Sequence, residues 1–114
     1  MTQARTLLWI AAALGLAMPV TAQVSGFALV NNSGGALSGL SIRRVGSDEW
    51  TPLKAAPAAG ARASASFDNP DCAFDLRATI AGVGQTMWTG INLCGVKNLS
   101  LNRDSAGRSW VDYE

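Results

Sequence analysis

The side chains of this sequence that could do catalytic chemistry are restricted by one absence, since the chain contains no histidine. His-based catalytic triads and dyads, His-ligated zinc or iron and His-based pH switches are therefore excluded. Serine is plentiful, but none lies in a Gly-x-Ser-x-Gly motif, and its general base would have to be Lys or Asp. The eight carboxylates could act only as a pair in a cleft, for which a small domain has little room. We expect no catalytic residue; a carboxylate-dependent hydrolase is the enzymatic alternative.

Three acidic residues, Asp68, Asp71 and Asp75, lie close enough in sequence to suggest a calcium site. The alternating ligand positions, central Gly and closing Glu of an EF-hand loop are missing, however. Asp68 and Asp71 flank a turn, where Asp commonly forms local hydrogen bonds. We interpret the cluster as a solvated turn and expect neither a metal nor another cofactor.

The two cysteines, Cys72 and Cys94, predict a structural disulfide. Two thiolates without His are too few ligands for a structural zinc site, and redox-active pairs are usually closer in sequence. On the loop-closure model a disulfide over this distance contributes about 3 kcal/mol of stability. Such bonds persist outside the reducing cytosol.

Residues 1–22 have the pattern of a Sec-type signal peptide. Arg5 precedes the apolar run Leu7–Met18, Pro19 ends that run, and small residues before Gln23 suit cleavage. A transmembrane anchor is the alternative, but a helix of this run would rise only about 18 Å, against a hydrocarbon core of roughly 30 Å. We expect the remaining residues, 23–114, to form one periplasmic or secreted domain without a membrane span.

The charge of the chain bears on its partners. Its nine basic and eight acidic residues become eight and eight once the leader with Arg5 is removed. A neutral domain lacks the basic field that holds a phosphate backbone, so nucleic acid is not an expected partner.

Short segments with apolar residues at every second position, separated by Gly, Asn, Asp or Pro, predict β-strands. The segments are Val24–Asn31, Leu37–Val45, Ala61–Phe67, Ala73–Ile80, Gln85–Leu93, Val96–Leu101 and Arg108–Tyr113, with Trp50–Leu53 as a further short candidate. We expect an all-β fold, a single antiparallel β-sandwich or small barrel of about seven strands.

The segment between the cysteines predicts a hairpin. Val83 lies midway between Cys72 and Cys94, so a turn centred there pairs the cysteines directly and places Trp88 opposite Ala78. Ile91 and Leu93 would then face away from the core. Either a bulge near Gly90 shifts the register by one residue, or both faces of the sheet are covered.

Large aromatic residues are the best candidates for a contact surface. Trp50, Trp110 and Tyr113 have no evident place in the core, and exposed aromatics rimmed by polar groups mark sites for glycans or proteins. Packing in the core or at a sheet edge is the alternative for each. The nearby pairs Arg43-Arg44 and Asp48-Glu49 are most simply a solvated face with weak ion pairs.

Three segments of the chain together resemble a group of small exported proteins of Gram-negative bacteria. They are Phe27–Gly34 (FALVNNSG), Cys72–Arg77 (CAFDLR) and Trp88–Cys94 (WTGINLC). The resemblance extends from about Phe27 to Tyr113 and departs around Ala55–Ala65. It implies architecture and location but no catalytic residue. A label of argininosuccinate lyase, attached to some members, does not suit this chain, because that enzyme is a large helical protein.

These observations predict a non-enzymatic binding or interaction module whose partner, a protein or a glycan, is not identified by any motif. Unpaired sheet edges and terminal loops are generic binding sites in such a domain. A structural or self-assembling component of the cell envelope is the alternative outside the enzyme class.

Overall fold

The structure, a computed structural model, describes residues 26–114, which form eight β-strands and no helix. The strands are β1 (Phe27–Asn32), β2 (Leu37–Arg44), β3 (Thr51–Pro52), β4 (Arg62–Ala65), β5 (Ala73–Ile80), β6 (Gly84–Asn92), β7 (Asn98–Arg103) and β8 (Ser109–Tyr113). The all-β prediction is confirmed. The predicted number of about seven was one too low, because the two-residue β3 is a strand.

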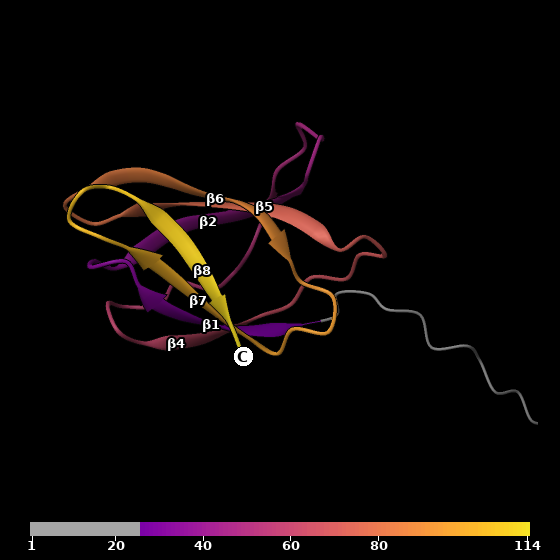
Figure 1. Cartoon of the computed structure of the whole chain (residues 1–114), viewed down its shortest axis with the longest axis horizontal. Coiled ribbons are helices and arrows are strands. Elements are labelled where there is room, and N and C mark those ends of the chain that lie inside the picture. Colours follow the sequence, from indigo (N-terminus) through magenta and orange to yellow (C-terminus); the bar gives the residue numbers. More distant parts are fainter. Residues whose placement is uncertain (1–25) are drawn as a thin grey trace, which may run out of the picture.

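The strands form two sheets of four, ordered β4-β1-β7-β8 and β3-β2-β5-β6, which face each other across one core (Figure 1). Every pair is antiparallel except β1 with β7, which run in parallel. The expectation of a purely antiparallel fold was therefore wrong. Alternation of apolar and polar residues shows which side of a strand is buried, but it is the same for both strand directions.

The core consists of the inward side chains of both sheets. Leu29 and Leu101 from one sheet and Leu76 and Trp88 from the other are almost completely buried. The indole Nε1–H of Trp88 donates to the carbonyl oxygen of Asn102 at 3.0 Å, so a buried hydrogen bond joins the two sheets. A buried indole N–H without a partner would destabilise the core, so this hydrogen bond satisfies a group that burial removes from water.

The β5–β6 hairpin differs in register from the prediction. Its turn is centred on Gly82 rather than Val83, since Ile80 pairs with Gly84. Trp88 therefore lies opposite Leu76 and not Ala78. Both registers keep Trp88 on the core face, because they differ by an even number of residues across the ladder.

The predicted bulge near Gly90 is present. The register shifts between Phe74 and Leu76, and Gly90 has a φ of 64°, which favours a residue without Cβ. The extra residue lets Trp88 and Ile91 both face the core, and both are buried.

The Cys72–Cys94 disulfide is confirmed, with Cα atoms 5.0 Å apart. The two cysteines lie just beyond the paired ends of β5 and β6, where the N–H of Leu93 donates to the carbonyl of Cys72. The bond closes the end of the hairpin that is opposite its turn.

The predicted signal peptide, residues 1–22, lies outside the described residues. Within residues 26–114 there is no helix with the length and apolar character needed to cross a membrane.

Candidate functional site

The three candidate contact aromatics lie on three different surfaces. Trp50, just before β3, lies on the outer face of the β3-β2-β5-β6 sheet, where its ring contacts two arginines. The guanidinium carbons of Arg43 and Arg77 are 4.6 and 4.1 Å from the ring centroid, within cation–π distance. The ring is half-buried, so Trp50 is held by its own sheet.

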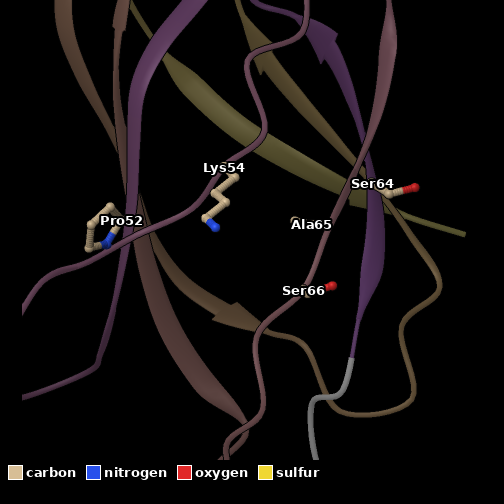
Figure 2. Close-up of a pocket in the computed structure, with 5 residues that line it drawn as sticks. All are labelled: Pro52, Lys54, Ser64, Ala65 and Ser66. Atoms are coloured by element: carbon tan, nitrogen blue, oxygen red, sulfur yellow. The ribbon is translucent and has the colours of Figure 1, made fainter.

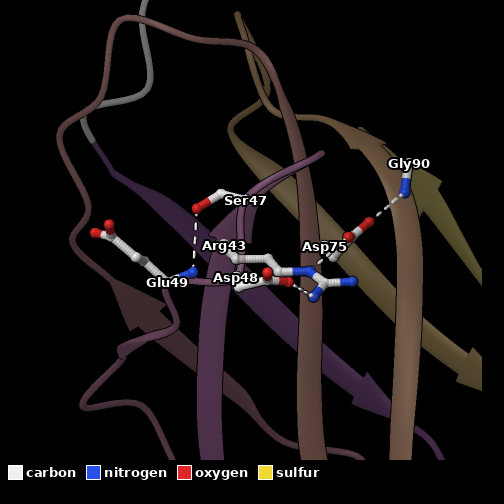
Figure 3. Close-up of polar contacts among 6 residues, drawn as sticks. All are labelled: Arg43, Ser47, Asp48, Glu49, Asp75 and Gly90. Carbon is white, nitrogen blue, oxygen red and sulfur yellow. Dashed lines mark hydrogen bonds and ion pairs between the residues drawn. The ribbon is translucent and has the colours of Figure 1, made fainter.

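A buried carboxylate organises the same face (Figure 3). Asp75, only 5% exposed, accepts hydrogen bonds from Arg43 Nε at 2.9 Å and from the backbone N–H of Gly90 at 3.0 Å. Asp48, in contrast, is exposed and lies 3.9 Å from Arg43. The prediction of only weak surface ion pairs was therefore wrong for Arg43, whose main partner is the buried Asp75.

The buried carboxylate also explains the bulge. Asp75 lies in β5 at the point where the register of β6 shifts, so the N–H of Gly90 is satisfied by a side chain instead of the ladder. Asp75 is therefore part of the hairpin and not of a solvated turn. We call the outward cluster Arg43, Trp50, Asp75 and Arg77 the Arg43 face.

Tyr113 lies on the side of β8 that is turned toward β6. Its hydroxyl accepts a hydrogen bond from the N–H of Asn92 at 3.0 Å, and Ser109 on the same side donates to the carbonyl of Met87 at 3.0 Å. These two bonds hold β8 against β6, so Tyr113 has a structural contact although its side chain is 46% exposed.

Trp110 lies on the opposite side of β8, because side chains alternate along a strand and Val111 packs against the core. The residue is 45% exposed, and none of the described side-chain hydrogen bonds or cation–π contacts involves it. Its cross-strand partner is Asn102. Asp112 follows two residues later on the same face.

Asn102 holds Asp112 beside Trp110. The amide Nδ2 of Asn102, which is 8% exposed, donates to Asp112 Oδ2 at 3.1 Å. The other carboxylate oxygen of Asp112 has no hydrogen-bond partner within residues 26–114 and can accept a hydrogen bond from a ligand. An exposed aromatic ring and an oriented carboxylate thus lie side by side.

The rest of this outer face is built from small and polar side chains. We call the surface the Trp110 face; its outward residues are Ser100 and Asn102 of β7 and Trp110 and Asp112 of β8. Ser100 pairs with both Val30 and Asp112. Short side chains around one large ring leave that ring standing above its neighbours.

The turn that carries the chain into β8 is organised by an acidic residue. Asp104 Oδ1 accepts the backbone N–H groups of Arg108 at 2.9 Å and Ala106 at 3.0 Å, and its Oδ2 accepts Arg108 Nε at 2.8 Å. The hydrogen bond from the Arg108 N–H, together with the Arg108 side chain and the Ala106 N–H, lowers the pKa of Asp104, while desolvation acts in the opposite direction.

The acidic residues do not gather into a metal site in the described part of the chain. No group of three His, Cys, Asp or Glu side chains with suitable geometry is found there. Asp71 lies 3.5 Å from Arg44, and Asp75 is engaged by Arg43.

Asp112 and Asn102 were not predicted as site residues from the sequence. The spacing of Asp112 from Trp110 could have identified Asp112 as a neighbour of that ring. Residues two apart in a strand share a face, and residues three apart do not. That rule groups Trp110 with Asp112 and separates it from Tyr113. Asn102 had no such signal, because its place depends on the pairing of β7 with β8.

Comparison with known protein families finds no match, and comparison with curated proteins finds none either. Among solved structures, the chain is similar to an NMR structure of a protein from Eubacterium rectale. The TM-score is 0.51 at 12% identity, over 80% of this chain and 87% of that chain. A likeness at this identity shows a shared fold. The resemblance to small exported proteins stays a prediction.

Proposed function

We propose that the chain is an exported, non-enzymatic binding domain that holds a saccharide on the Trp110 face. The predicted signal peptide and the disulfide support a periplasmic or secreted location. The absence of histidine supports a binding role over an enzymatic one.

One observation carries the proposal: the exposed Trp110 ring stands beside an oriented carboxylate on an otherwise small and polar face. The C–H groups of a sugar ring pack on an aromatic face, while its hydroxyls donate to groups such as Asp112. The centre of a protein–protein contact is usually richer in aromatic and apolar residues and poorer in charge. The composition of the Trp110 face therefore favours a glycan over a protein.

Titration of the isotopically labelled mature protein with oligosaccharides of neutral, amino and acidic sugars tests the proposal by NMR. We expect amide shifts confined to β7 and β8 with at least one class of sugar. Trp110→Ala should abolish them, and Asp112→Asn should weaken binding by about tenfold, since a lost hydrogen bond contributes about 1 kcal/mol or somewhat more with a charged acceptor.

Val83→Ala is the matched control, because Val83 is an apolar residue of similar exposure, 47%, in the β5–β6 turn. It should bind as the unaltered protein does. Binding that survives Trp110→Ala, or no shift with any class of sugar, would overturn the proposal.

A further inference from the structure

Among the described residues, 26–114, the edge strand β4 leaves part of its backbone unpaired. It is the first strand in the order β4-β1-β7-β8, so only one of its sides has a neighbouring strand in this part of the chain. The N–H of Asn31 donates to the carbonyl of Ala61, and bonded pairs recur at every second position of an antiparallel ladder. The backbone groups of Ala63 and Ala65 therefore face β1, whereas those of Arg62 and Ser64 point away from the sheet.

A groove of about 420 Å³ runs beside this edge, between the two sheets (Figure 2). Its lining residues are Pro52, Lys54, Ser64, Ala65 and Ser66. Pro52 has no N–H and lies in the two-residue β3, which is the edge strand of the facing sheet. An added strand can therefore continue the ladder of β4 but finds little to pair with on β3.

The edge carries positive charge without a carboxylate. Within residues 26–114, neither Lys54 nor Arg62 has an acidic group within 4.0 Å, and Arg62 donates instead to the side-chain oxygen of Asn98. Figure 2 shows the Lys54 amine extending between the segments that carry Pro52 and Ala65.

The same charges argue against a second copy of this chain. Two β4 edges paired antiparallel around a two-fold axis would bring Arg62, at the start of one strand, toward Lys54, beside the end of the other, and like charges close together destabilise a strand pair. Edge lysines are a common device against such self-pairing. An acidic partner meets no such repulsion.

We propose that β4 binds an extended acidic peptide as an added strand. Its main chain pairs with Arg62 and Ser64, alternate side chains enter the groove, and a carboxylate meets Lys54. This site is separate from the Trp110 face, because β4 and β8 are opposite edges of one sheet, about 14 Å apart at the usual strand spacing.

Hydrogen exchange with a synthetic peptide of alternating Val and Glu tests the proposal, with a Val/Lys peptide as the charge control. The Val/Glu peptide should slow exchange of the Arg62 and Ser64 amides by at least about tenfold at saturation, because both gain a partner. The Ala63 and Ala65 amides already face β1 and should change little. Unchanged exchange at Arg62 and Ser64 would overturn the proposal.

Ser64→Pro removes one outward N–H without removing a bond to β1, and should abolish binding. Ser64→Ala keeps that N–H and is the matched control, expected to bind as the unaltered protein does. If Ser64→Pro does not fold, the variant Lys54→Glu tests the proposal instead. It should weaken binding of the Val/Glu peptide and strengthen binding of the Val/Lys peptide. Equal preference for both peptides before and after that change would contradict the proposal.

Trp110→Ala separates this site from the proposed saccharide site, since it should leave peptide binding unchanged. Sedimentation of the peptide-free protein should show a monomer. A dimer whose Arg62 and Ser64 amides are protected from exchange would show that a second copy, rather than a peptide, occupies the edge.

Discussion

The two outer faces of the sandwich each carry one tryptophan, but only one of these is committed to its own sheet. On the Arg43 face, Trp50 covers two guanidinium groups, and Arg43 in turn is bound by the buried Asp75. On the Trp110 face, the ring is 45% exposed and its polar neighbours bind one another beside it. Residue type alone therefore does not identify a contact residue; the partners of the side chain do.

The difference follows from what each sheet needs. The β5–β6 hairpin has a bulge whose free N–H requires an acceptor, and Asp75 supplies it. A buried carboxylate then requires a cation, which is Arg43. The β7–β8 hairpin has an unbroken ladder of five pairs, so its outward side chains need not accept a hydrogen bond from an unpaired backbone N–H.

The largest expected effect concerns the disulfide, a covalent bond that only one of the two sheets contains. The disulfide lies in the sheet of the Arg43 face, and the double variant Cys72→Ala/Cys94→Ala should lower the free energy of unfolding by about 3 kcal/mol. Urea unfolding measures this, with the reduced unaltered protein as the control. A loss below about 1 kcal/mol would show that the hairpin is held without the bond.

The next effect compares two aspartates. Asp75→Ala should lower the free energy of unfolding by about 2 kcal/mol, because it leaves Arg43 and the Gly90 N–H without their acceptor. Asp112→Ala, its counterpart on the Trp110 face, should change stability by no more than about 0.5 kcal/mol. Equal losses in urea unfolding would remove the distinction between the faces.

Removal of Trp50 should lower the stability more than removal of Trp110 does, in line with the two aspartates. Trp50→Ala is expected to lower stability by about 1 kcal/mol, since it removes both cation–π contacts, whereas Trp110→Ala should have about half that effect or less. Quenching by acrylamide provides a second measurement. Removal of Trp110 should eliminate most of the quenchable fluorescence, and a larger loss on removal of Trp50 would contradict the assignment.

The smallest effect concerns the exposed turn before β8. The pKa of Asp104 is lowered in the folded state, so its contribution is present above the ordinary pKa of Asp and is lost as the pH falls through the lowered value. Asp104→Asn should flatten this acidic part of the stability profile. Asp68→Asn, at an exposed position, is the control, and an equal flattening there would refute the role of Asp104.

The elements of the fold were largely predictable. Ala73–Ile80 is the strand that its alternation predicts, and β8 differs from its predicted range by one residue. The bulge near Gly90 was predictable too, because Trp88 and Ile91 are three residues apart and a regular strand cannot bury both. The disulfide was predictable because the chain has only two cysteines and no histidine that could complete a zinc site with them.

The side-chain contacts of Asn31, at the end of β1, could not be predicted from the sequence. From the sequence Asn31 was predicted only as the last residue of the strand Val24–Asn31, yet it is fully buried, and its Nδ2 donates to the carbonyls of Gly35, Pro57 and Ala58. Pro57 and Ala58 are more than twenty residues away. No local pattern predicts an acceptor so distant in sequence.

Local information was thus sufficient for strands, turns, a bulge and a disulfide, because each depends on residues within one hairpin or on a chemically unique pair. The parallel pairing of β1 with β7, the burial of Asp75 and the exposure of Trp110 depended on tertiary structure. They arise from which strands become neighbours, and the gain in burying apolar side chains is nearly the same for several such arrangements. The candidate site belongs to this second class, since the exposure of Trp110 and the hydrogen bond from Asn102 to Asp112 depend on which strands are neighbours.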